Sequence, residues 1–200
     1  MRYSRLVPAS NDERSTTRHS VQAVTRRTVA LVNALTAADA APDPPPAPPS
    51  PAEIAELLRT YGESDPVDLT ASDVTDLRAA ALLLRAVFTA EDVDAAAAAL
   101  NRLLRRGRGT LRLTSHAGRS PWHPHLDGDD DAPWGEWFLA SACLALTLLV
   151  WDRQRPPGGV CASSTCENVF TNEGSGPPRR YCSRRCATRE RVAAHRRARA

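Results

Sequence analysis

Four cysteines near the C-terminus constrain the fold more than any other feature of the chain. Cys161, Cys166, Cys182 and Cys186 have the spacing C-x4-C-x15-C-x3-C. Two close pairs separated by such a loop can bring four thiolates into a tetrahedron around one ion, the closed arrangement of structural zinc. Few sizeable apolar side chains surround them, so a core alone cannot hold this segment together. We therefore predict that residues 160–200 form a small zinc finger with one structural Zn(2+) ion, unfolded without the metal.

The spacing of the second cysteine pair predicts a helix. Cys182 and Cys186 are four residues apart, so they share one face of a helix that starts near Ser183 and continues to about residue 199. A rigid basic helix held by a metal ion is suited to contact a DNA groove. The residues predicted to contact DNA are Arg184, Arg191, His195 and Arg199 on or near the face opposite the cysteines, and Arg189, Arg196 and Arg197 nearer the zinc.

Charge is distributed unevenly along the chain. The formal net charge of +3 combines an acidic middle with a C-terminal segment in which nine arginines accompany the single Glu190. Such asymmetry indicates a polyanionic partner. One alternative is that the arginines of this helix are merely solvated. Every basic side chain in this sequence is arginine, so the presence of arginines alone does not indicate a partner. A second is a zinc-dependent protein-interaction adaptor without DNA binding, which docks an acidic partner or the chain's own acidic loop around residues 129–131.

The function class predicted from these features is a DNA-binding transcription regulator, not an enzyme. Four thiolates close the coordination shell of zinc, whereas catalytic zinc keeps an open position. The sequence has no glycine-rich phosphate loop, nucleophile elbow or convincing paired carboxylates. A single finger has a small footprint, so specific binding is expected to need a homodimer or a second contact surface. Nothing in the sequence names a small-molecule effector.

The chain upstream of the finger is predicted to be mainly α-helical with a small β element. Its apolar residues are dominated by alanine and leucine and recur at helical spacing. Residues 1–18 are polar and aperiodic, which predicts a disordered leader. The helical domain spans residues 19–155, with a proline-rich loop at 42–51. Its expected helices cover residues 19–37, 51–61, 72–88, 90–105 and 134–152. A short strand is expected at 110–114, and the segment around Trp122 is its nearest candidate partner.

Two further features of this domain bear on metal binding. His123, His125 and Asp127 have a spacing that can bind a second metal ion on a strand. The interposed Pro124 and the loop setting favour an ordinary loop instead. Cys143 lies in the middle of an apolar helix, so we predict that it packs in the core and does not bind metal.

The location expected for the protein is cytoplasmic, without a membrane partner. No secretory signal is visible at the N-terminus. The most apolar stretch, 137–151, is shorter than the roughly 20 residues needed to cross a bilayer and is expected to be a buried core helix. In a reducing cytosol, grouped cysteines indicate metal rather than disulfides, and free structural thiols are the remaining alternative.

The finger resembles the CGNR zinc-finger family. The segments CASSTC at 161–166, RYCS at 180–183 and CATR at 186–189, followed by a basic helix, carry the resemblance. The upstream residues, with LVNAL at 31–35, resemble the alanine-rich ABATE domain of stress-induced transcription regulators, which usually precedes such a finger. The resemblance implies that the finger binds DNA and that the larger domain has a sensing or assembly role.

The finger departs from the family motif at two positions. Ala187 and Thr188 stand where the family has Gly and Asn. Both residues tolerate the first turn of a helix, so we expect zinc binding to survive. Of the last three residues of the Cys-Gly-Asn-Arg motif, only the arginine is present in this sequence, as Arg189.

Overall fold

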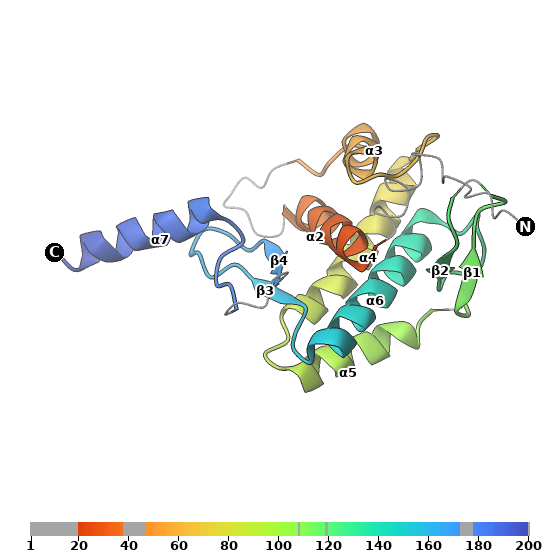
Figure 1. Cartoon of the computed structure of the whole chain (residues 1–200). Coiled ribbons are helices and arrows are strands. Elements are labelled where there is room, and N and C mark those ends of the chain that lie inside the picture. The colour runs from red at the N-terminus through yellow and green to blue at the C-terminus, as the bar shows by residue number, and fades with distance from the viewer. Residues whose placement is uncertain (1–19, 38–46, 108, 119, 173–177, 200) are drawn as a thin grey trace, which may run out of the picture.

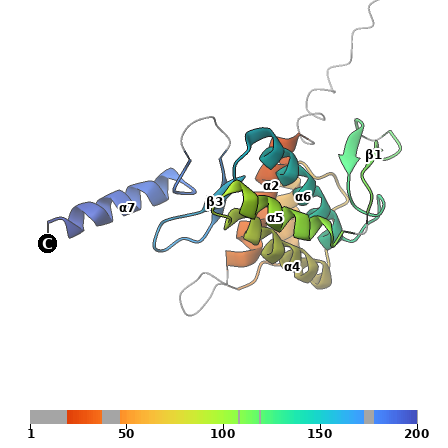
Figure 2. The same ribbon diagram turned by 90° about the horizontal axis from the view of Figure 1, so that it is seen from below.

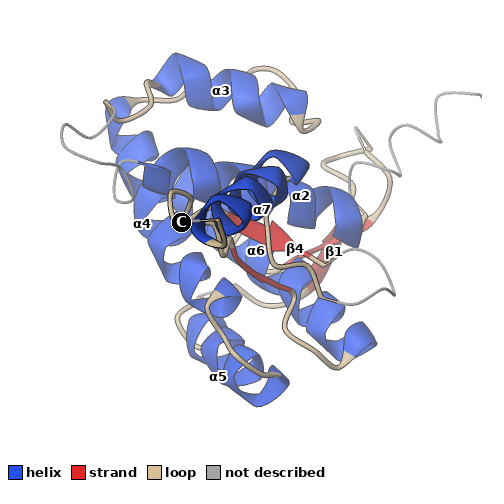
Figure 3. Cartoon of the chain, turned by 90° about the vertical axis from the view of Figure 1, so that its left-hand side faces the viewer, coloured by secondary structure: helices blue, strands red, loops and turns tan. Residues whose placement is uncertain are grey.

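The protein is seen in a computed structural model that describes residues 20–37, 47–107, 109–118, 120–172 and 178–199 (Figure 1). The predicted leader and residues 42–46 of the proline-rich loop lie outside these ranges. Within them the chain is mainly helical (Figure 3). Its strands are short and form two separate pairs. The predicted fold class is confirmed.

The described part of the chain contains six helices, close to the predicted ones. They are α2 (Val21–Thr36), α3 (Pro51–Thr60), α4 (Ala71–Phe88), α5 (Val93–Leu104), α6 (Trp134–Arg153) and α7 (Arg184–Arg197). Five of them begin at a side chain that accepts a hydrogen bond from the first turn. These capping residues are Ser20, Ser50, Thr70, Asp92 and Ser183. The cap at Asp92 explains why α5 begins later than residue 90, where the apolar pattern placed it.

Helix α6 lies at the centre of the core. It packs against α2, α4 and α5 (Figures 1 and 2). Gly135 permits a close approach to α4, because a Cβ atom there would lie 2.9 Å from the Cβ of Asp76. The fully buried side chains of this core include Leu31 and Leu35 of α2, Leu77 and Leu84 of α4, and Phe138 and Leu146 of α6. We call α2 to α6 the helical body.

The apolar character of α6 follows from its central position. It is the one described helix that is long and apolar enough to cross a membrane. Nine of its residues are nevertheless buried by neighbouring elements of the protein, as in the core helix that the sequence predicts. The cytoplasmic location stays a prediction.

Two antiparallel hairpins complete the described fold. Strand β1 (Arg112–Thr114) pairs with β2 (His123–His125), which confirms the expected strand and its partner beside Trp122. Strand β3 (Gly158–Val160) pairs with β4 (Val169–Thr171), a hairpin that the sequence did not predict. Gly158 is required there, because a Cβ atom would lie 1.7 Å from the carbonyl oxygen of Phe170. Gly158 and Gly159, although glycines are typical of linkers, therefore belong to strand β3.

The β3–β4 hairpin fixes the finger to the helical body. Asn33 of α2 donates from Nδ2 to the carbonyl oxygen of Val169 at 3.0 Å and accepts from its N–H at 2.8 Å. The Val169 side chain is fully buried in the same core cluster as the helices. Arg85 of α4 donates to the carbonyl oxygen of Glu167 at 2.7 Å, and Arg153 of α6 donates to that of Asn172. These contacts therefore hold the finger in a defined position on the helical body.

Candidate metal centre

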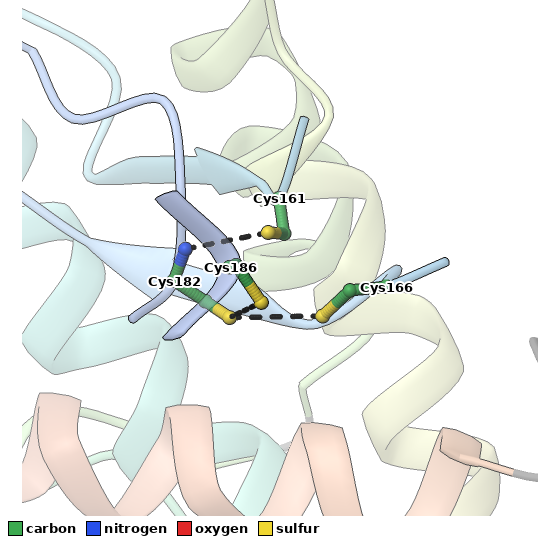
Figure 4. Close-up of side chains that lie close together, drawn as sticks. All are labelled: Cys161, Cys166, Cys182 and Cys186. Atoms are coloured by element: carbon green, nitrogen blue, oxygen red, sulfur yellow. Dashed lines mark hydrogen bonds between the residues drawn. The ribbon is translucent and has the colours of Figure 1, made fainter. Parts of the chain in front are cut away.

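The four cysteines of the finger converge on one point, although they come from four separate places in it (Figure 4). Cys161 follows β3 and Cys166 lies in the loop before β4, whereas Cys182 precedes α7 and Cys186 lies in its first turn. Their sulfur atoms all lie within 4.8 Å of one another. We call residues 161–166 the first knuckle and residues 182–186 the second.

The spacing of the sulfur atoms fits a tetrahedral zinc ion. The Sγ atoms of Cys166 and Cys182 are 3.6 Å apart, and those of Cys182 and Cys186 are 3.7 Å apart. Zn–S bonds of about 2.3 Å in a tetrahedron place neighbouring sulfurs about 3.8 Å apart. Cys161 and Cys186 are buried and the other two are partly buried, so solvent reaches little of the cluster. The cluster holds one structural Zn(2+) ion, as predicted.

The thiols of this cluster differ in acidity. Burial raises the pKa of Cys182 to about 12 and also raises the pKa of Cys166. The neighbouring Ser183 hydroxyl lowers the pKa of Cys186 to about 7. Near neutral pH, Cys186 is thus readily available as a thiolate, whereas zinc must displace the protons of Cys166 and Cys182.

Hydrogen bonds hold the two knuckles around the ion. The N–H of Cys182 points at the Cys161 sulfur, 3.4 Å away, and this contact orients that ligand (Figure 4). The Ser183 hydroxyl accepts from the N–H of Cys186 at 3.2 Å and caps α7. Because Ser183 both caps the helix and lies beside a ligand, the start of α7 and the zinc geometry are determined together.

Two neighbouring residues of α7 fasten the helix to the first knuckle. Glu190 accepts from the Ser163 hydroxyl at 2.9 Å and from the N–H of Ser164 at 3.0 Å. Arg189 donates to the Thr165 hydroxyl. The Ser163 hydrogen bond is the main reason that the pKa of Glu190 is lowered. Sequence reasoning missed Glu190, whose only signal is that it is the single acidic residue in a run of arginines.

Beyond these anchors α7 projects from the rest of the protein. Figures 1 and 2 show it extending away from the helical body, and it contacts no other helix or strand in the part of the chain that the structure describes. Cys186 is its only buried residue. The predicted DNA contacts Arg184, Arg189, Arg191, His195, Arg196, Arg197 and Arg199 are all exposed on or just after this helix.

Other predictions from the sequence concern residues distant from the zinc site. Cys143 lies buried on α6, and burial raises the pKa of its thiol to about 12, in agreement with a core role. The acidic loop 129–131 follows β2, at the opposite end of the body from α7 (Figures 1 and 2). The suggestion that the finger docks this loop within one chain is therefore wrong. Asp130 is instead paired with Arg112, 2.7 Å away.

A separate cavity lies in the helical body, between α4, α5 and α6. Its volume is about 390 Å³. Its lining is mainly apolar and includes Leu83, Leu103 and Leu139, with Asp76, Arg106 and Glu136 as charged groups. Such a mixture of apolar walls and a few polar groups is typical of small-molecule sites.

Comparison with known proteins supports the zinc finger. No curated protein matches the chain. The resemblance of residues 19–155 to the ABATE domain therefore stays a prediction. The model of the CGNR zinc finger family matches residues 159–199, a range that includes strand β3 except its first residue, both knuckles and the whole of α7.

Proposed function

We propose that this protein is a DNA-binding transcription regulator in which α7 contacts DNA and the helical body has a sensing or assembly role. The observation that carries the proposal is the exposure of α7. The helix stands clear of the body, is fixed at its N-terminal end by zinc, and presents basic side chains. The major groove of DNA is wide enough to admit one α-helix, and phosphates on its edges attract guanidinium groups.

The residues of α7 divide into two groups in this proposal. Arg189 and Glu190 position the helix, because their side chains bind the first knuckle. The proposed groups for DNA are the exposed side chains that have no such hydrogen bond in the described structure. They are Arg184, Arg191, His195, Arg196, Arg197 and Arg199. Arg189 is expected to reach phosphate only from the edge of the contact.

The proposed role of the helical body rests on its cavity and on its connection to the finger. The cavity between α4, α5 and α6 offers space for a small effector. Helix α2, which packs on both α4 and α6, holds strand β4 through Asn33. In this proposal, a change in the packing of these helices moves Asn33 and with it strand β4, which positions the finger on the body.

Binding of full-length protein to mixed DNA duplexes at several salt concentrations tests the proposal. The double variant Arg184→Ala and Arg191→Ala removes two charges from α7. The matched control, Arg102→Ala and Arg105→Ala, removes two exposed charges from the end of α5. We expect affinity to fall with salt at a slope of about −0.9 per phosphate neutralised, and the α7 variant to reduce the slope by about 2.

The outcomes of this experiment separate the proposal from its alternative. Unchanged binding by the α5 control, together with retained zinc in both variants, supports the role of α7. Absence of salt-dependent binding to any duplex contradicts the proposal. Capture of a specific acidic protein that survives nuclease treatment then supports the adaptor, with that protein as a separate molecule.

A further inference from the structure

Three histidines converge at the β1–β2 hairpin, at the other end of the body from the zinc finger. His116 lies in the turn after β1, and His123 and His125 lie on β2. The Nε2 atom of His123 is 3.3 Å from that of His116 and 3.1 Å from that of His125. The sequence indicated His123 and His125 but not His116, which comes from outside the His-x-His motif.

The backbone of the turn brings His116 to this position. His116 and Ala117 have φ angles of 48° and 57°, in the left-handed region that residues other than glycine seldom adopt. Two successive residues in this region cost free energy, which is typical of segments that hold a functional geometry. The turn folds His116 back over the hairpin, beside the two histidines of β2.

Each of the three rings is oriented by an acceptor at its other nitrogen. The Nδ1 atom of His123 lies 2.7 Å from the carbonyl oxygen of Pro121. That of His125 lies 2.9 Å from the carboxylate of Asp127, and that of His116 lies 3.1 Å from the carboxylate of Asp130. Carbonyl oxygens and ionised carboxylates only accept hydrogen bonds, so each Nδ1 carries the proton. In the neutral rings the Nε2 lone pair of His123 therefore faces those of His116 and His125.

The partner carboxylates are themselves held in place. Arg112 of β1 lies 3.0 Å from the carboxylate of Asp127 and 2.7 Å from that of Asp130. Asp127 is therefore not a direct ligand, as the sequence suggested, but a group that orients His125. Carboxylates and backbone carbonyls that orient histidines in this way form the outer shell of metal sites in proteins.

We propose that His116, His123 and His125 bind a second divalent transition-metal ion, with zinc as the preferred ion. Three nitrogen lone pairs at this distance repel unless a cation lies between them. Metal–nitrogen bonds of about 2.0–2.1 Å in a tetrahedron place two ligand nitrogens about 3.3–3.4 Å apart, close to the spacing in this cluster. Three imidazoles suit zinc and its neighbours in the first transition series, not calcium or magnesium.

This site differs from the finger in coordination. Four thiolates complete the shell of the zinc ion in the finger, whereas three histidines leave a fourth position for water or an exchangeable anion. His116 and His125 are partly exposed, and the neighbouring Trp122 is 72% exposed. The proposed ligand of the fourth position is therefore a small molecule or anion from solvent.

Elemental analysis of untagged full-length protein, loaded with zinc and dialysed against buffer, tests the proposal. We expect two zinc ions per chain in the wild type and one in His123→Ala or His116→Ala. Cys182→Ser is also expected to retain one, since it removes only the ion of the finger. His195→Ala is the matched control, because His195 is an exposed histidine on α7 that lies outside the cluster, and it is expected to retain two. A circular dichroism spectrum like that of the wild type shows that each variant is folded.

Cobalt distinguishes the two sites and tests the orienting role of Asp127. Cobalt bound to the finger gives sulfur charge-transfer bands, whereas cobalt at the histidines gives visible bands without them. Asp127→Asn is expected to weaken cobalt binding at the histidines about 10–100-fold and to leave the sulfur bands unchanged.

The rival interpretation is that protons, not a metal, join the rings, with His116 and His125 as imidazolium ions. The proposal is overturned if wild-type protein holds one zinc ion and the histidine variants hold the same. It is also overturned if nitrogen NMR shows two imidazolium rings in zinc-saturated protein.

Discussion

The helical body and the zinc finger are stabilised by different interactions. In the body, α6 buries nine residues against its neighbours, and hydrophobic burial is the dominant favourable contribution. In the finger, α7 buries only Cys186, and zinc with a few hydrogen bonds holds it. A helix fixed by a metal at one end has no need of an apolar face. The remaining surface of α7 is therefore available to a partner, whereas much of the surface of α6 is buried against neighbouring helices.

Removal of zinc gives the largest difference expected between the two regions. Zinc contributes about 10–16 kcal/mol of apparent free energy in small fingers, which no packing in the knuckles replaces. Chelation or Cys182→Ser is expected to abolish amide protection in α7 and both knuckles and to preserve it in α4 and α6. Hydrogen exchange measures both regions at once. Cys143→Ala, which changes a cysteine outside the cluster, is expected to leave α7 protected.

Truncation of a core side chain is expected to have the converse effect. Leu146 of α6 is fully buried, so Leu146→Ala should lower the free energy of unfolding of the body by about 2–5 kcal/mol. Urea denaturation followed by circular dichroism measures this change, and zinc content should stay at the wild-type level under native conditions. Leu82→Ala is the control, because Leu82 is 42% exposed and its loss should cost about 0.5 kcal/mol or less. Equal effects of both variants would contradict the assigned core.

The zinc affinity of the finger should increase with pH, unlike the stability of the apolar core. An ordinary cysteine thiol has a pKa of about 8.5, so the thiols of the unfolded, metal-free finger are protonated near pH 7. Burial in the folded knuckles raises the pKa of Cys182 to about 12 and also raises that of Cys166. Zinc binding must displace at least the protons of these two thiols, and this displacement becomes easier as the pH rises. Affinity should therefore increase by at least about 100-fold per pH unit between pH 6.5 and 7.5. Competition with a chelator of known pH dependence measures this slope, and a flat profile contradicts it.

Substitution of the residue that joins the two regions is expected to have the smallest effect. Asn33→Ala leaves the N–H and carbonyl groups of Val169 without their side-chain partner, at a cost of about 1–3 kcal/mol. Hydrogen exchange should become faster in β4 and the knuckles, with zinc retained. Asn101→Ala on the exposed face of α5 is the control. Exchange in β4 that is equal in both variants would show that Asn33 does not anchor the finger.

The sequence predicted the features that depend on local patterns. Apolar periodicity located the helices, and the cysteine spacing identified the zinc site. Features that depend on distant contacts were missed. The anchor between Asn33 and Val169 joins residues 136 positions apart. Strand β3 has the sequence Gly-Gly-Val, which shows no alternation of apolar and polar side chains, and a turn with positive φ angles brings His116 to β2.

The DNA affinity of Cys182→Ser measures the central claim most directly, because this variant keeps every arginine and loses only the metal that orders α7. Fluorescence anisotropy with a labelled duplex at fixed salt compares it with the wild type. Ordering a segment on binding costs about 2–5 kcal/mol, so the variant should bind DNA about 30-fold more weakly, or worse. Equal affinity of the two proteins would show that arginine charge alone is sufficient and would contradict the role assigned to zinc.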